Sequence, residues 1–532
     1  MAVVQISRIQ VRRGQKNSGS GLPQLASGEF GWAIDTQQLY IGNGAVSEGA
    51  PYVGNTQLLT QYDDLFQYAS NYAYRKNDGF IDTNGVERSL QDRLDDRVSV
   101  RSFGVVADGT DQTANFQRAI DQLFLNDANK NNSASRVVLH VEPGQYTFNG
   151  TIYIPPHATI VGAGKEKTRF IFQGTGPAFR TVNGESQPGS PADDSITQFG
   201  DQARRIHMSG FTLVTRQNTT ALHLENCRDS LFKDIRLESF FSFGDTNENS
   251  SNGILLNGLS NAVLSRTNIF ENIEISNFAN CVYSDWDITD NKFINCNFVA
   301  CNRGIVFGLN TVLGLSGQTV GPFNNTIQGC RFLDYEKQAV YVKTGTGNLT
   351  KDNKFYRGGS LGGDATNTLY SVVQFDQNGN HSENDWFTRT SELSSTYPTA
   401  PYLPEVKGNN FSDINFTQSL TIGYYGQFSR LFKLSATNTK SIIIEYIYKS
   451  STLGATRSGV LSILYNADTE RAELTDEYDF IGPDDSKADN LVFDVQTFDH
   501  NSDSVVDTIG VMVLNSTSND DATFYYRVKN RS

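Results

Sequence analysis

The segment Asn268-Ile-Phe270-Glu-Asn-Ile273-Glu-Ile275 decides the fold, because its pattern returns along the chain. An Asn is followed two residues later by a large apolar residue, and further apolar residues alternate after it. Copies begin at Asn291, Asn325, Asn353, Asn384 and Asn409, and a version without the Asn begins at Leu231. The aligned apolar positions, 232, 270, 293, 327, 355, 386 and 411, are 23 to 38 residues apart. A period in this range indicates stacked repeats.

Each repeat is predicted to contribute short strands, since alternating apolar residues are typical of strands rather than helices. A second phrase, a small residue followed by apolar alternation, lies between the copies, as in Gly253-Ile-Leu-Leu256 and Gly304-Ile-Val-Phe307. Stacking would place the Asn side chains in an amide ladder at a turn and the large apolar side chains in the interior. We therefore predict a mainly β protein built on a right-handed parallel β-helix, with an irregular β-sandwich as the alternative.

The composition limits the classes of partner. With 532 residues, the chain is too long for one ordinary domain. Its formal net charge of −14 argues against nucleic acid as a partner. No stretch approaches the length of a membrane span and no signal-peptide core is visible, so we expect synthesis in a cytoplasm and no membrane insertion.

The five cysteines all lie in the repeat region. They have no zinc-site spacing, and their odd number does not form a disulfide framework. We expect reduced thiols in the core, and we predict neither a metal nor another cofactor.

Residues 1–54 are predicted to form a small β-domain, because short alternating strands are joined by Gly turns. Its phrases are Arg12-Arg-Gly14, Ala26-Ser-Gly-Glu-Phe-Gly31, Asp35-Thr36 and Tyr40-Ile-Gly-Asn-Gly44. This series resembles the N-terminal module of bacteriophage tail fibres and tailspikes. The resemblance implies attachment of residues 1–54 to a tail or baseplate protein of a virion.

Residues 55–98 are predicted to form a helical neck. Apolar residues recur at heptad spacing from Leu58 to Tyr72 and again from Leu90 to Val98. Each seam is too short to hold alone, so we expect a parallel bundle of identical chains, which the family resemblance implies to be a homotrimer. The alternative is a lone amphipathic helix packed on its own chain.

Residues 99–419 are assigned to the β-helix. The stretch from Ser99 to Asp111, followed by Asn115-Phe-Gln-Arg-Ala-Ile120, resembles the entry segment of pectate-lyase-like β-helices in phage tailspikes. We expect Asp111 to cap a helix that covers the open end of the β-helix.

From about residue 420 to 532 the Asn repeat stops, and alternating segments predict an antiparallel β-sandwich. Locking a trimer, capping the β-helix and contacting glycans are all open as roles for it.

The candidate site residues are carboxylates and aromatic rings, since no nucleophile motif, phosphate loop or His metal pair is visible. Glycoside cleavage needs two carboxylates, and the best cluster is Asp285-Trp286-Asp287. Asp285 and Asp287 are the candidate catalytic residues, and Trp286 is the candidate ring for stacking on a sugar. Tyr335 and Glu336 are further ligand-binding candidates. The alternatives are solvated turn acids, a Trp packed beneath a loop, and a site between subunits.

The resemblance implies a tailspike or tail fibre in the virion tail that binds host surface polysaccharide, and it leaves cleavage of that polysaccharide open. If it is an enzyme, a glycoside hydrolase is favoured over a lyase, because no cluster of basic residues is visible in the sequence. The alternative is a non-catalytic structural or adhesive tail or baseplate component. A free secreted lyase is disfavoured by the anchor-like N-terminus.

Overall fold

The structure, a computed structural model of the full chain, describes residues 11–17, 23–50, 53–60, 97–121, 138–182, 202–241, 251–258, 264–285, 287–308, 321–357, 372–377, 379–389, 406–407, 410–412, 414–422, 429–436, 441–450, 453–485, 490–498, 508–515 and 520–531. Residues 1–96 and 97–532 form two compact units.

The first unit is a four-stranded sheet made of β1 (Arg12–Gly14), β2 (Phe30–Ala33), β3 (Gln38–Gly42) and β4 (Asn55–Leu58), with a short 3-10 helix η1 (Val46–Glu48). Strands β1 and β2 are parallel and the other pairs are antiparallel. The Asp35 carboxylate accepts backbone hydrogen bonds from Lys16 and Asn17, each at 2.8 Å, and these bonds lower its pKa. A Cβ on Gly42 would lie 2.1 Å from the Ala26 carbonyl oxygen. The Asp35-Thr36 and Tyr40-Ile-Gly42 phrases therefore supply residues that this small sheet needs for its turns and packing.

The predicted helical neck over residues 55–98 is wrong at both of its described ends. Residues Asn55–Leu58 form β4 and pair with β3, so they belong to the N-terminal sheet. Residues Val98–Ser99 form strand β5, which pairs with β6. The seam positions between 61 and 96 lie outside the described residues.

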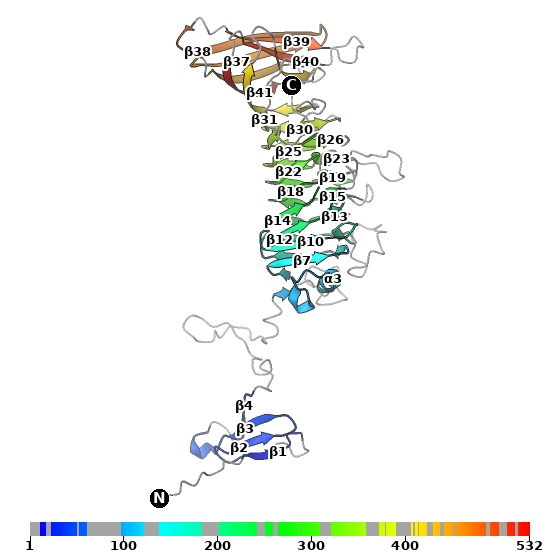
Figure 1. The fold of residues 1–532 in the computed structure, drawn as a ribbon, viewed down its shortest axis with the longest axis vertical. Helices are drawn as coiled ribbons and strands as arrows, with labels where there is room; N and C mark the ends of the chain where they lie inside the picture. Colours follow the sequence, from blue (N-terminus) through cyan, green and yellow to red (C-terminus); the bar gives the residue numbers. More distant parts are fainter. Residues whose placement is uncertain are drawn as a thin grey trace, which may run out of the picture. The chain divides into compact units, whose positions relative to one another are not determined.

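The second unit is a parallel β-helix, as the repeat predicts (Figure 1). One strand of each coil enters a nine-stranded sheet: β8 (Ile152–Ile154), β11 (Phe179–Thr181), β13 (Thr220–Glu225), β15 (Asn252–Asn257), β19 (Asn280–Ser284), β23 (Arg303–Phe307), β26 (Val340–Val342), β29 (Val373–Phe375) and β32 (Val406–Lys407). The other strands enter a larger sheet, called here the large sheet. It begins with β6 (Val138–Val141), β7 (Gly144–Phe148), β9 (Thr159–Gly162), β10 (Thr168–Phe172), β12 (His207–Val214) and β14 (Leu231–Glu238).

From β17 on, each described coil gives the large sheet two short strands. These are β17 (Ile269–Glu271) and β18 (Glu274–Ser276), β21 (Lys292–Ile294) and β22 (Asn297–Cys301), β24 (Thr326–Gln328) and β25 (Arg331–Tyr335), β27 (Leu349–Lys351) and β28 (Lys354–Arg357), β30 (His381–Glu383) and β31 (Trp386–Arg389), and β33 (Asn410–Ser412) and β34 (Ile414–Ile422). Two further short strands, β16 (Ser265–Arg266) and β20 (Ile288–Thr289), pair at the turn between the sheets.

Columns of Phe side chains fill the interior. The rings of Phe232 and Phe270 lie 5.2 Å apart, and those of Phe270 and Phe293 lie 4.7 Å apart and nearly parallel. A second column runs through Phe298, Phe332, Phe355 and Phe387 at 4.7 to 4.9 Å. Stacked rings at this spacing bury large apolar areas and repeat the rung distance of the strands.

The predicted amide ladder is present at the turn before β17, β21, β24, β27 and β30. Each Nδ2 donates to the Oδ1 of the next coil, from Asn268 to Asn291 at 2.9 Å and from Asn291 to Asn325 at 3.0 Å. The series continues through Asn348 to Asn380 at 2.9 Å per step. The same Oδ1 atoms accept backbone N–H bonds from the coil before, as Asn348 does from Asn325. The ladder therefore satisfies backbone groups that the turn leaves unpaired.

Two of the predicted copies are in the wrong register. Phe355 pairs with Phe332 and Phe387, so the segment from Asn353 belongs to the second strand of its coil. Asn353 donates to Asp385 at 2.9 Å in a separate, second ladder. Trp386 is not an interior residue, since it is 45% exposed and Phe387 takes the inward position.

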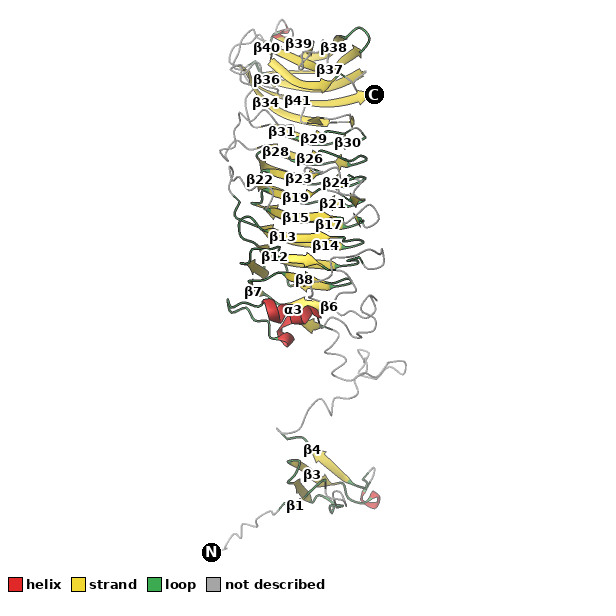
Figure 2. Cartoon of the chain, turned by 90° about the vertical axis from the view of Figure 1, so that its right-hand side faces the viewer, coloured by secondary structure: helices red, strands yellow, loops and turns green. Residues whose placement is uncertain are grey.

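The helix α3 (Thr113–Asp121) closes one end of the β-helix, as expected (Figure 2). Its Phe116 ring lies 5.1 Å from Phe148 and 5.4 Å from Phe170 in the core. A short 3-10 helix η2 (Val100–Phe103) precedes it. Asp111 lies one residue before the N-cap position, and its carboxylate accepts a hydrogen bond from the Thr113 N–H at 3.1 Å.

The C-terminal part is an antiparallel sandwich, as predicted. Strand β34 pairs in parallel with β31 and antiparallel with β41, so the change of architecture lies within one strand. One sheet contains β34, β41 (Asp520–Arg531), β36 (Ser441–Ser450), β37 (Ala455–Asn466) and β38 (Arg471–Ile481). The facing sheet contains β35 (Ser429–Ser435), β40 (Thr508–Asn515) and β39 (Leu491–Phe498). Buried Arg457 joins the two sheets by donating to the Leu491 carbonyl at 2.6 Å.

All five cysteines are buried free thiols, which confirms the expectation. Cys296 and Cys330 are neighbours in successive coils, and burial raises the pKa of the Cys330 thiol well above its ordinary value. They act as small apolar residues.

Replacing Asn325 by Ala should lower the melting temperature, because it removes two steps of the ladder and leaves the Asn291 amide and backbone without an acceptor. The expected loss is about 3 kcal/mol, from buried amide groups at roughly 1 to 3 kcal/mol each. Scanning calorimetry measures it, with the exposed Gln328→Ala in the same coil as the control. If the two variants had the same melting temperature, the ladder would not stabilise the fold.

Candidate functional site

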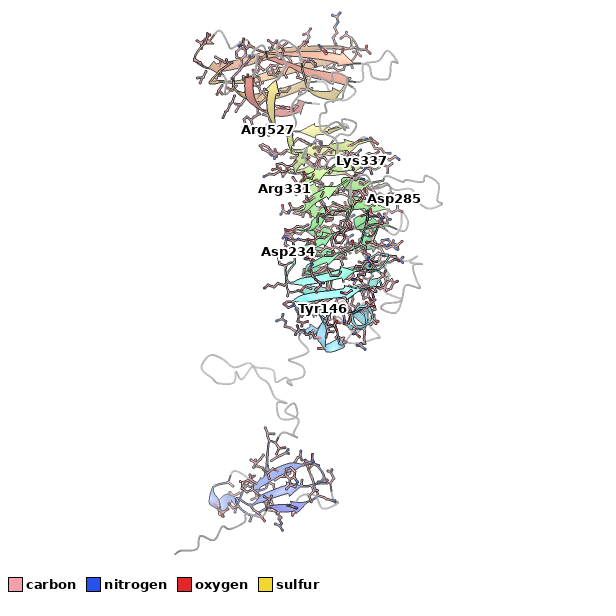
Figure 3. The ribbon with its side chains drawn as sticks, in the orientation of Figure 1. Tyr146, Asp234, Asp285, Arg331, Lys337 and Arg527 are labelled. Atoms are coloured by element: carbon pink, nitrogen blue, oxygen red, sulfur yellow. The ribbon has the colours of Figure 1, made fainter. Side chains whose placement is uncertain are left out.

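Asp285 follows β19 on the side of the β-helix opposite Asp234 and Arg331 (Figure 3). Its Oδ1 accepts a hydrogen bond from the Tyr283 hydroxyl at 2.6 Å, and its backbone N–H donates to the Asn257 side chain at 3.1 Å. The residue is half-buried. The sequence-predicted Asp285 is therefore a fixed acceptor at the surface.

Asp287 does not provide a second exposed carboxylate beside Asp285. It lies between β19 and β20, its backbone has a left-handed φ of 54°, and its side chain is fully buried. Among the described residues, neither carboxylate oxygen has a hydrogen-bond partner. Burial raises the pKa of Asp287 to about 6. Trp286 lies outside the described residues.

Tyr335 is a core residue and not a ligand contact. It is 4% exposed and stacks on Cys301 of the preceding coil. Asp334 before it has a φ of 55°, so Tyr335 turns inward where the alternation predicts an outward position. Glu336 is half-buried, and its backbone N–H donates to the Cys301 carbonyl at 2.9 Å.

The outer face of the nine-stranded sheet carries residues that the sequence does not single out. Its outward column runs, in register, through Leu255, Tyr283, Val306, Tyr341 and Gln374. The central three form a small apolar cluster with Leu255 packed against it. Leu255, Tyr283, Val306 and Tyr341 are each the third residue of a copy of the second phrase, so that phrase holds the signal for them. The column sets two tyrosines on one face of the β-helix.

Tyr341 repeats the arrangement of Tyr283. Its hydroxyl donates to Asp376 Oδ2 at 2.7 Å, just as Tyr283 donates to Asp285. Burial, and then the hydrogen bond to Asp376, raise the pKa of Tyr341, so the phenol stays protonated and remains a donor. Each of the two carboxylates is thus oriented by a tyrosine behind it.

A chain of hydrogen bonds also holds Asp376. Arg303 donates to Gln338 at 3.0 Å, Gln338 donates to Gln374 at 3.0 Å, and Gln374 donates to Asp376 Oδ1 at 2.8 Å. Arg303 and Gln338 are buried, whereas Asp376 is exposed. The buried amides and guanidinium fix the direction of an exposed acceptor.

The distance between the Asp285 and Asp376 carboxylates limits the chemistry that the two can perform together. Backbone hydrogen bonds place Asp285, Gly308, Lys343 and Asp376 at the same position of successive coils. Three rungs of about 4.8 Å separate the two carboxylates by roughly 14 Å. Glycosidase pairs lie roughly 5 to 9.5 Å apart, so these two do not flank one bond. They suit contacts to different sugars of one chain.

A separate hollow of about 890 Å³ lies where Trp386 meets the outer face of the C-terminal sheet. Exposed Ile447, Val460 and Tyr525 line it together with Glu445 and Glu477. None of the predicted site residues is in it.

In the described part of the chain, no group of three His, Cys, Asp or Glu side chains is placed to hold a metal ion. No described helix combines the length and apolarity that a membrane crossing requires.

Residues 97–306 match the protein-family model described as rhamnogalacturonase A/epimerase, pectate lyase-like. This match confirms the pectate-lyase-like resemblance over these residues. No curated protein matches the sequence.

Similar solved structures have low sequence identity and TM-scores below 0.5. ORF18 of Geobacillus virus E2 has a TM-score of 0.43 and 15% identity, over 86% of each chain. The gp42 tailspike of Acinetobacter phage vb_AbaP_AS12 has a TM-score of 0.31 and 11% identity, over 89% of this chain and 94% of that one. DFA-IIIase of Arthrobacter chlorophenolicus A6, in complex with DFA-III, has a TM-score of 0.39 and 12% identity, over 62% of this chain and 85% of that one.

Replacing Asp287 by Asn should raise stability at neutral pH. The folded-state pKa of about 6 lies above the ordinary 3.8, so the stability of the parent is full below about pH 4 and is lost as the pH rises through 6. The difference amounts to about 3 kcal/mol at pH 7.5 and shrinks toward pH 4.5.

Melting temperatures of both proteins at these two pH values measure this. A variant that is less stable than the parent at pH 7.5 would mean that the ionised carboxylate has a favourable partner.

Proposed function

We propose that this protein is a bacteriophage tail protein that binds a surface polysaccharide of the host along the side of its β-helix. The observation that carries the proposal is the repeated pair of a buried tyrosine and a surface carboxylate, Tyr283 with Asp285 and Tyr341 with Asp376. The phage-like phrases of residues 1–54 support a place in the virion tail, and the pectate-lyase-like match supports a polysaccharide as ligand.

The geometry suits recognition of sugar hydroxyls. Ionised carboxylates accept charge-assisted hydrogen bonds from hydroxyl donors, and such bonds are stronger than neutral ones. Because the tyrosines hold Asp285 and Asp376 in place before binding, little side-chain entropy is lost when a ligand arrives. Exposed Lys343 lies in the same column between them and supplies a donor. Two acceptors and one donor thus lie in one column along the axis of the β-helix.

Cleavage of the bound polysaccharide is a further part of the proposal. A glycoside hydrolase mechanism needs a carboxylic acid and a second carboxylate within about 10 Å. The raised pKa of Asp287 suits an acid, with Asp285 as its partner, but Asp287 is fully buried. This burial favours the second candidate function, a non-catalytic adhesin of the tail. A hydrolytic site shared between subunits is the other arrangement that fits.

We further propose that residues 1–54 attach the protein to a tail or baseplate protein and that the chain acts as a homotrimer. Sedimentation equilibrium of the full chain should then give three times the mass of 58.9 kDa. A mass of one chain contradicts the trimer.

The proposed function is tested with the full chain on a panel of capsular polysaccharides and lipopolysaccharides from many bacteria. At least one polysaccharide should bind, and Asp285→Asn and Asp376→Asn should each weaken its binding about tenfold or more, the loss of one charge-assisted hydrogen bond. Glu383→Gln is the matched control, because this carboxylate pairs with Lys351 on the large sheet.

Gel filtration of the bound polysaccharide reports cleavage in the same experiment, since a hydrolase shortens the chain. Binding that is equal in the parent and in both Asp variants would contradict the proposed face. Failure to bind any member of the panel would contradict the function.

A further inference from the structure

The β-helix and the sandwich share one continuous sheet, and a row of paired residues crosses their junction. Trp386 of β31 pairs with Asn415 of β34, and Asn415 pairs in turn with Arg527 of β41. The row continues from Arg527 to Glu445 of β36 and from Glu445 to Val460 of β37. Because paired residues of neighbouring strands point to the same face of a sheet, the described side chains of this row share the outer face. Arg527 marks the junction in Figure 3.

A second row runs beside the first, two residues further along each strand. It contains Tyr525 of β41, Ile447 of β36, Ser458 of β37 and Asp479 of β38, each the register partner of the one before it. Residues of both rows line the hollow of about 890 Å³ on the outer face of the C-terminal sheet, which is called here the junction hollow.

Exposed apolar side chains form part of the lining of the junction hollow. Trp386 is 45% exposed and Tyr525 is 40% exposed, although rings of this size are buried for the most part in folded proteins. Ile447 and Val460 are exposed as well. Apolar surface that is gathered in one concave place and left open to solvent is typical of a binding site.

Charged groups lie in the middle of the same hollow. Glu445 is central in the first row, and Lys529 holds its carboxylate in an ion pair at 2.6 Å. Exposed Glu477 and Asp479 of β38 add two further carboxylates to the described lining, and Arg527 adds a guanidinium. The described lining is therefore acidic overall, with rings and aliphatic side chains between its carboxylates.

This combination of rings and carboxylates distinguishes between classes of partner. The centre of a protein–protein interface is depleted in charged residues, whereas in the junction hollow Val460 lies between the register partners Glu445 and Glu477. An acidic ligand would meet carboxylates of its own charge. An uncharged sugar fits both features, because its C–H face packs on an aromatic ring and its hydroxyls donate hydrogen bonds to carboxylates.

We propose that the junction hollow is a second polysaccharide site, which binds uncharged sugar rings through Trp386 and Tyr525 and their hydroxyls through Glu445 and Glu477. The inference rests on the proposed function and adds to it a place and a charge class of sugar. The sequence pattern places Trp386 in the interior, so its position in the hollow follows only from the register of β31.

The first measurement titrates the full chain with each neutral polysaccharide of the panel and with polygalacturonate, which carries a carboxylate on each sugar. At least one neutral polysaccharide should bind, and Trp386→Ala and Tyr525→Ala should each weaken its binding about tenfold, because each variant removes a ring from the site. Phe240→Ala is the matched control. It removes a 66%-exposed ring outside the hollow and should change the affinity less than about twofold.

The second measurement uses tryptophan fluorescence to detect the sugar in the hollow. A bound neutral polysaccharide should shield Trp386 from quenching by acrylamide. Trp386→Phe should keep the affinity within about threefold, since an aromatic ring remains, but should lose this protection. The other two tryptophans, Trp32 and Trp286, are the same in both proteins. Sedimentation equilibrium of Trp386→Ala should give the same mass as the parent.

Three results would overturn the inference. One is neutral polysaccharide binding that is equal in the parent and in both Ala variants, with no protection of Trp386. Another is a chain that binds acidic polysaccharides alone. The third is a lower sedimentation mass of Trp386→Ala, because a second copy of the chain would then cover the hollow.

The outcomes also separate this inference from the proposed function. Weaker binding in Asp285→Asn and Asp376→Asn, with no effect of Trp386→Ala, removes the junction hollow and leaves the proposed face. Weaker binding in Trp386→Ala, with no effect of the two Asp variants, supports the junction hollow and removes the proposed face. Failure of the whole panel to bind removes both.

Discussion

The structure depends on one constraint: the backbone polar groups buried at the turns of a parallel β-helix are satisfied through the coil above or below them. The Asn268 to Asn380 ladder meets this constraint, because each amide donates to the next side chain and each carbonyl oxygen accepts from the preceding coil. Since an unpaired buried polar group costs roughly 1 to 3 kcal/mol, the register of the coils is fixed at this turn. The Phe columns follow the same register and fill the space inside it.

Function follows from this constraint, because a fixed register turns single residues into columns. A side chain that points outward in one coil stands above its counterpart in the next, at about 4.8 Å. Asp285, Lys343 and Asp376 lie in one such column. A surface built from columns is long, straight and repetitive, which is the shape of a polysaccharide rather than of a small ligand.

Much of this fold can be predicted from sequence, because the Asn and Phe positions obey a local rule that survives changes in loop length. The register of Asn353 and Trp386 cannot, since both strands of a coil begin with a similar phrase and nothing local distinguishes them. Among the site residues, Asp285 is placed as the pattern predicts. Asp287 is not, because it is fully buried. Tyr335 is not, because the left-handed Asp334 before it breaks the alternation, and the sequence does not show which Asp residues adopt that conformation. Asp285 and Asp376 belong to coils of unequal length, so their alignment exists only after stacking.

The most direct measurement of the central claim is a structure of the full chain bound to an oligosaccharide prepared from a polysaccharide that it binds. Sugar rings should lie along the axis of the β-helix, with hydroxyls on the carboxylates of Asp285 and Asp376. Sugars in the hollow beside Trp386 and Tyr525, with the face of Asp285 empty, would contradict it.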